Sequence, residues 1–190
     1  MRFHQAPLLI FPLLVNLLTT RAFSDGNDHP INDASIKVQF ERKLGKLKDD
    51  KKTTDTTLIF TQLKEQNKIH TDLPKISDTN LRSSEIYKNR KDSVLCLGSI
   101  YKCDRCSNWH GNIAGGFIIT RDGLAVTNYH VMKNSKASAF GAMNIQGEIY
   151  PIEKIVASSE KDDLAIVKLK GDEFKPLPIA KSAPVGSDVT

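Results

Sequence analysis

A predicted β-hairpin in the middle of the chain constrains the fold most strongly. Two apolar runs rich in branched side chains, residues 117–120 and 124–126, flank the turn sequence Arg-Asp-Gly at positions 121–123. Branched residues on both sides of an Asp-Gly pair are a strong signal for two antiparallel strands joined by a tight turn. The stretch therefore predicts a sheet whose second strand ends just before His130.

His130 is a candidate general base because of its place in this pattern. Histidine changes charge near neutral pH, and a histidine just past a buried strand combines a rigid backbone with an accessible ring. Further along the chain, Asp162 and Asp163 lead directly into another branched run, residues 164–169. A carboxylate at a strand edge fixes the imidazole tautomer and offsets the imidazolium charge. We therefore expect His130 and Asp163 to lie within hydrogen-bond reach, with the carboxylate facing Nδ1.

Three sequence blocks together resemble the trypsin-like serine peptidases of the HtrA-type and related bacterial groups. The blocks are Gly-Gly-Phe-Ile-Ile followed by Asp-Gly, then Thr-Asn-Tyr-His-Val, then Asp-Leu-Ala-Ile-Val-Lys-Leu. They occur in the family's order, and the resemblance covers residues 93–190. It implies that the catalytic residues include His130 as general base and Asp163 as its orienting acid. Asp162 is the less favoured acid, because the family's aspartate directly precedes the Leu-Ala pair.

The resemblance also implies a serine nucleophile in a Gly-x-Ser-Gly-Gly context. No Ser-Gly-Gly occurs in the sequence. We expect the nucleophile and the oxyanion loop in a second barrel encoded downstream of Thr190, and we expect the 190-residue chain alone to be inactive. A peptide-binding remnant without catalytic activity is the alternative function from a different class.

The pattern of short apolar runs predicts an all-β domain. Runs of strand length occur at residues 94–101, 111–120, 124–128, 136–143, 149–157 and 164–169. About six short strands separated by turns that contain glycine indicate a closed or nearly closed barrel. The resemblance implies that it is the first Greek-key barrel of the trypsin-like two-barrel fold, and we place this domain at residues 81–190.

Residues 25–80 are polar and charge-dense by comparison. Apolar residues at helical spacing predict two helices, with Ile36, Phe40, Leu44 and Leu47 in the first and Leu58, Ile59 and Leu63 in the second. Asp33 is the expected N-cap of the first, and a third short helix is expected from Ser83 or Ser84 to about Arg90. Two thin apolar stripes bury little area against the ordering entropy, so we expect a weakly structured leader and linker.

The first 24 residues predict a secretory signal peptide. Arg2 precedes an apolar run at residues 6–18, and Ala22 and Ser24 place small side chains where signal peptidase reads them. The run is shorter and more interrupted than the roughly 20 apolar residues that cross a bilayer. We expect cleavage before Asp25, a secreted or periplasmic protein, and no stable membrane insertion after cleavage.

The charge pattern does not indicate a nucleic-acid partner. The formal net charge is +5, and Arg2 and Arg21 of the predicted signal contribute two of these charges. The lysines are scattered, and arginine is not interleaved with aromatic residues. The expected partner is a polypeptide substrate, and no cofactor is expected.

All three cysteines lie between positions 96 and 106, and Trp109 and His110 follow them. A disulfide between Cys103 and Cys106 is the favoured interpretation, because an exported chain meets oxidising conditions. A metal site is less favoured, because its fourth ligand would be Cys96, which lies in an apolar run, and because structural zinc usually takes ligand pairs from separate segments. Free thiols are the third interpretation. A Cys/His metal-binding module is accordingly the least favoured function, and His110 is disfavoured as catalytic base because no strand-held acid lies near it in the pattern.

Overall fold

The structure is a computed structural model that describes residues 32–65, 67–76, 81–180, 182 and 185–186. The predicted signal peptide and its cleavage position lie outside the described residues. Within the described ranges, no helix is long and apolar enough to cross a membrane.

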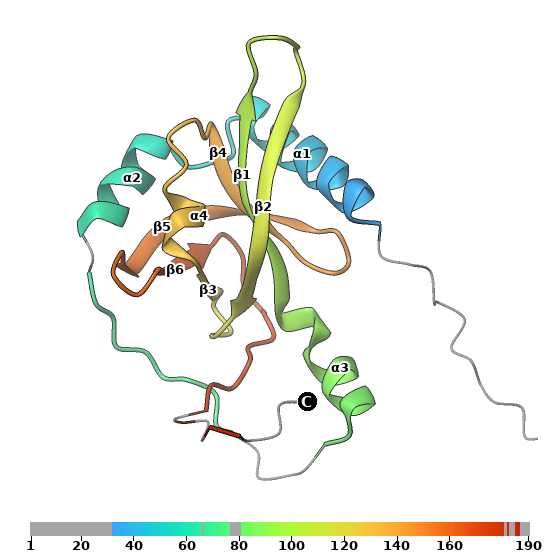
Figure 1. Cartoon of the computed structure of the whole chain (residues 1–190), viewed down its shortest axis with the longest axis vertical. Coiled ribbons are helices and arrows are strands. Elements are labelled where there is room, and N and C mark those ends of the chain that lie inside the picture. Colours follow the sequence, from blue (N-terminus) through green and yellow to red (C-terminus); the bar gives the residue numbers. More distant parts are fainter. Residues whose placement is uncertain (1–31, 66, 77–80, 181, 183–184, 187–190) are drawn as a thin grey trace, which may run out of the picture. The chain divides into compact units, whose positions relative to one another are not determined.

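In the described part of the chain, six antiparallel strands close into a β-barrel (Figure 1). The strands are β1 (Val94–Lys102), β2 (Trp109–Ile118), β3 (Leu124–Thr127), β4 (Ala139–Met143), β5 (Ile149–Ser159) and β6 (Leu164–Leu169). They pair in the order β1-β2-β3-β6-β5-β4, and β4 pairs with β1 to complete the circle. The predicted all-β class and barrel are therefore confirmed.

The barrel is accompanied by helices. Over the described residues these are α1 (Asp33–Asp49), α2 (Thr56–Glu65), α3 (Ser83–Arg90), α4 (Tyr129–Met132) and the single 3₁₀ turn η1 (Lys91–Ser93). The N-cap of α1 is Asn32, whose side chain accepts a hydrogen bond from the backbone N–H of Ser35, and not the predicted Asp33. At the start of α3, Glu85 accepts a hydrogen bond from the backbone N–H of Arg82, so this helix is capped by Arg82 and not by a serine.

The helices α1 and α2 are packed parts of the domain, so the expectation of a weakly structured leader is wrong for them. Four of their apolar side chains are at most 2% exposed: Phe40, Leu44, Ile59 and Leu63. In Figure 1 the two helices lie on different sides of the barrel, and α1 contacts β1, β2, β4 and β5 whereas α2 contacts β5 and α4. Both helices precede residue 81, the proposed start of the peptidase domain, and pack on the barrel that follows it. The position of that domain limit stays a prediction.

Strand β1 shows why α1 finds a partner surface. Leu95 and Leu97 belong to the main core, whereas Cys96 and Ile100, which point to the other face, belong to a second apolar cluster with Phe40 and Leu44 of α1. The strand is therefore apolar on both faces, and α1 covers the outer one. The apolar area buried by the docking of α1 therefore includes the outer face of β1 as well as the apolar side chains of the helix.

A glycine in β4 allows the close approach of α1. A Cβ atom added at Gly141 would lie 2.9 Å from Cδ1 of Leu44, well inside van der Waals contact. The absence of a side chain at this position leaves the space that the leucine fills.

Candidate active site

His130 lies on the single helical turn α4, directly after β3. Tyr129 and Met132 are 5% and 0% exposed, so they anchor this turn in the core. The side chain of His130 is 70% exposed. The predicted combination of a fixed backbone and an accessible ring is present, but the helical turn that produces it is too short to give a periodic signal in the sequence.

Asp163 lies in the turn between β5 and β6, next to the start of α4. Strand β6 pairs with β3, with Ala165 opposite Thr127, and this register brings the end of one connection beside the beginning of the other. Asp163 has a φ of +50°, in the left-handed region that few residues other than glycine adopt. Aspartate is one of those few, because its short polar side chain bonds locally.

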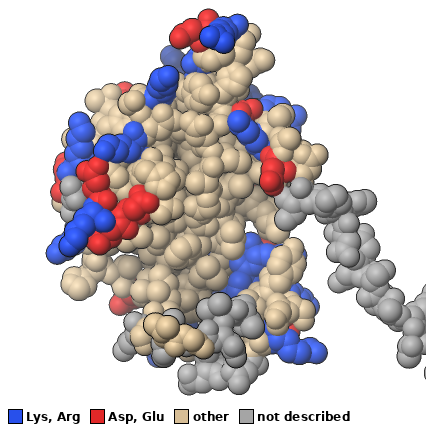
Figure 2. Space-filling model, viewed as in Figure 1, with Lys and Arg blue, Asp and Glu red and all other residues tan. Residues whose placement is uncertain are grey.

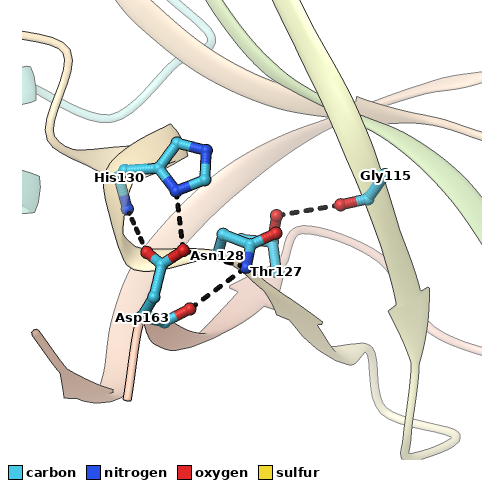
Figure 3. Close-up of polar contacts among 5 residues, drawn as sticks. All are labelled: Gly115, Thr127, Asn128, His130 and Asp163. Atoms are coloured by element: carbon cyan, nitrogen blue, oxygen red, sulfur yellow. Dashed lines mark hydrogen bonds and ion pairs between the residues drawn. The ribbon is translucent and has the colours of Figure 1, made fainter. Parts of the chain in front are cut away.

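The carboxylate of Asp163 makes two hydrogen bonds with His130 (Figure 3). One oxygen, Oδ1, accepts from the backbone N–H of His130 at 3.0 Å, and Oδ2 lies 2.8 Å from the ring atom Nδ1. In the figure the other ring nitrogen points away from the aspartate. Among the described residues, the ring of His130 has no hydrogen-bonding partner other than Asp163.

These contacts define the protonation pattern of the pair. The backbone N–H of His130, and after it the ring, hold the pKa of the Asp163 carboxyl below its ordinary value of 3.8. An ionised carboxylate only accepts hydrogen bonds, so Nδ1 of His130 carries the proton that it donates. The lone pair of the neutral imidazole is then on Nε2, where it is free to take a proton from another group.

Asn128 and Thr127 support the pair, and the sequence pattern indicated no role for either. The Asn128 amide donates to the backbone carbonyl of Asp163 at 3.2 Å and to its Oδ2 at 3.1 Å (Figure 3). The hydroxyl of the buried Thr127 donates to the carbonyl of Gly115 in β2 at 3.0 Å. Asn128 was recognisable as a polar residue that follows a buried strand at the same edge as the histidine.

The other candidate residues lie elsewhere. The carboxylate of Asp162 accepts a hydrogen bond from the hydroxyl of Ser159 at 2.7 Å and makes none to His130. His110 lies on β2, and its Nε2 is 3.0 Å from the Cys106 sulfur. Cys103 and Cys106 are free thiols with their sulfurs 3.0 Å apart, so the disulfide is not formed in the structure and stays a prediction for the exported protein.

Comparison with known proteins finds one similar family in part of the chain. Residues 114–190 match the family model described as the trypsin-like peptidase domain. This segment of the chain is therefore similar to the trypsin-like peptidase domain. The match includes both His130 and Asp163, and no curated protein matches the chain.

The similarity concerns only the later part of the barrel. Proteins of the matched family are peptidases, hydrolases that act on polypeptides, so at the level of that family the substrate class is a polypeptide. The match begins within β2, and therefore the helices α1 and α2 and the strand β1 precede it. The match by itself assigns no role to an individual residue.

Proposed function

We propose that this trypsin-like peptidase domain is the first barrel of a serine endopeptidase in which His130 is the general base and Asp163 the positioning acid. The observation that carries the proposal is the 2.8 Å contact between Nδ1 of His130 and Oδ2 of Asp163, made on adjoining edges of β3 and β6. The nucleophile in this proposal is a serine of a second barrel, which we expect C-terminal to the first by analogy with the family.

The proposed reaction uses the free ring nitrogen of His130. The serine oxygen attacks the peptide carbonyl while Nε2 takes the hydroxyl proton, and the same nitrogen then returns that proton to the departing amine. Asp163 keeps the proton on Nδ1 and stabilises the imidazolium that forms. The second hydrogen bond, from the backbone N–H of His130, keeps the carboxylate in place throughout.

The surface around the pair is compatible with contact to another domain. On the face that Figure 2 shows, acidic and basic side chains lie beside each other at the margin, whereas the centre of the face, over β2, is mostly uncharged. Charged residues are depleted in the cores of protein–protein contacts, so this distribution supports the proposal that a second barrel covers part of this face.

A fluorophosphonate probe, which labels activated serines, tests the proposed chemistry. We expect the 190-residue chain to stay unlabelled, because it supplies base and acid without a nucleophile. We expect a form that carries the proposed second barrel to be labelled on a serine outside residues 25–190. In that form, His130→Ala is expected to abolish labelling, because the hydroxyl then has no base.

The matched control is His70→Ala, which removes an exposed histidine that lies between α2 and α3. Its labelling is expected to equal that of the unmodified protein. Labelling of a serine within residues 25–190, or labelling that survives His130→Ala, would refute the proposed mechanism.

Export of the protein is part of the same proposal. It rests on the charged start, the short apolar run and the small residues at positions 22 and 24. We expect intact-mass spectrometry of the exported protein to find a chain that begins at Asp25. A membrane-bound species that still begins at Met1 would contradict the proposed cleavage and the secreted or periplasmic location.

A further inference from the structure

The tip of the β1–β2 hairpin gathers two thiols and an imidazole. In Figure 1 this tip extends beyond the barrel, at the end of the hairpin remote from β3. The Cys106 sulfur is 3.0 Å from the Cys103 sulfur and 3.0 Å from Nε2 of His110. The three atoms all lie within 4.8 Å of one another. Such a group is not needed for a peptidase mechanism based on His130 and Asp163.

The strand pairing explains why these three side chains meet. Lys102, the last residue of β1, is the register partner of Trp109, the first residue of β2. Cys103 directly follows this last pair, His110 is the register partner of Tyr101 one pair earlier, and Cys106 lies in the short connection between the strands. The neighbouring pair, Tyr101 and His110, has its rings 5.8 Å apart.

Trp109 fixes this end of the hairpin against α1. Its indole N–H donates to the carboxylate of Asp49 at 3.3 Å. The ring lies so close to the helix that a Cβ atom at Gly45 would be 2.2 Å from its Cδ1. The ammonium group of Lys102 lies 4.2 Å from the centre of the ring and donates to the carbonyl of Ser107 at 2.5 Å. The backbone of His110 is thus held in place independently of any bound ion.

We propose that Cys103, Cys106 and His110 bind one zinc-like divalent cation through two thiolates and Nε2. Thiolate sulfur and imidazole nitrogen are the ligands that zinc prefers. Tetrahedral coordination with typical zinc bond lengths separates two such ligand atoms by about 3.5 to 3.8 Å. The two separations of 3.0 Å need to widen by less than about 1 Å, and the third, from the Cys103 sulfur to Nε2 of His110, lies within 4.8 Å and needs a shift of similar size at most.

The three side chains supply only three of the four ligands of a tetrahedral zinc site. Among the described residues, no fourth His, Cys, Asp or Glu joins the group of three. The fourth tetrahedral position is therefore open to water. All three ligands come from one hairpin whose end is held against α1 by Trp109. Little conformational entropy is therefore lost when they come together, and a fourth ligand from a distant segment is not required.

The position of His110 separates this proposal from a disulfide at the same place. A disulfide brings the sulfurs to about 2.0 Å and makes no use of an imidazole. In the structure Nε2 of His110 points to the Cys106 sulfur at hydrogen-bonding distance. Because thiolates are the ligands, a Cys103–Cys106 disulfide and a bound metal exclude each other. An experiment on the redox and metal state therefore decides between them.

Titration of the reduced 190-residue chain with Co²⁺ is the direct test. We expect one Co²⁺ per chain, with the intense visible absorption of tetrahedral cobalt and a sulfur-to-cobalt charge-transfer band, both lost when one equivalent of Zn²⁺ is added. The double variant Cys103→Ser/Cys106→Ser is expected to lose the charge-transfer band. His110→Ala is expected to raise the Kd by at least about tenfold, since even the loss of an outer-shell partner costs about 10- to 100-fold.

The matched controls are Cys96→Ser and His70→Ala. Cys96 lies on β1 under α1, and His70 is exposed in the segment after α2, so both variants should bind Co²⁺ as the unmodified chain does. A reduced, folded chain that leaves Co²⁺ with the spectrum of the aqueous ion would overturn the proposal. So would binding that is unchanged in the double cysteine variant, or a Cys103–Cys106 disulfide and no metal in protein isolated from the exporting cell.

Discussion

Replacement of Asp163 by asparagine is expected to lower kcat/KM for peptide hydrolysis by about 10⁴-fold in the proposed enzyme, with its second barrel present. The substitution keeps the size of the side chain but leaves one oxygen where the carboxylate has two. If that oxygen accepts from the backbone N–H of His130, the amide NH₂ faces Nδ1. An NH₂ group stabilises the tautomer with its proton on Nε2, and this tautomer cannot act as the base.

The neighbouring residue provides a matched control for this prediction. Asp162→Asn makes the same chemical change one position earlier, at a carboxylate that bonds to Ser159 and not to His130. Its kcat/KM is expected to stay within about threefold of the unmodified enzyme, in line with the small effects of most surface substitutions. Equal losses in the two variants, or a loss below about tenfold in Asp163→Asn, would show that Asp163 does not position the base.

Phe40→Ala in α1 is expected to lower the free energy of unfolding by about 3–5 kcal/mol. The phenylalanine is 0% exposed and packs with Leu44, Ile100 and Met143, so its removal leaves a cavity between the helix and the barrel. Domains of this size are stabilised by only about 5–15 kcal/mol in total. A loss of this magnitude would therefore remove a large share of the stability of the whole barrel.

Urea unfolding followed by tryptophan fluorescence measures this effect directly. The chain has a single tryptophan, Trp109, and its indole packs against α1 beside Gly45, so its emission reports on the helix and on the barrel together. Val38→Ala is the control, because Val38 is on the same helix but 61% exposed, and its effect should stay within about 0.5 kcal/mol. Similar unfolding midpoints for both variants would mean that α1 is dispensable for stability.

The barrel was predictable from the sequence because its signals are local. The Asp-Gly turn at 122–123 and the branched runs on either side specify β2 and β3, and the Asp-Leu-Ala block specifies β6. Strand ends were less accurate, as β4 begins at Ala139 and not at 136, because a turn from Asn134 to Ala137 follows α4. The contact between His130 and Asp163 was also foreseen, since both residues lie at the edges of strands.

The docking of α1 and α2 was missed for a physical reason. The apolar stripes of the helices by themselves bury too little area to offset the entropy of ordering. The apolar surface of the barrel that receives them adds to this area. That surface was visible in residues 94–101, which are apolar at both even and odd positions, a pattern typical of a strand covered on both faces. The left-handed backbone of Asp163 and the helical turn α4 have no comparable signature, because each depends on the register between β3 and β6.

The burial of Phe40 under β4 also determines when α1 can pack during synthesis of the chain. Met143 is the last of the strand residues that cover this side chain, and it is synthesised about a hundred residues after Phe40. At ordinary rates of translation this delay is about 5–20 s. During that interval the apolar face of α1 has no partner in its own chain and is a target for chaperones. Because the contacts are so distant in sequence, the closing of the barrel over α1 is expected to be a slow, late event of folding.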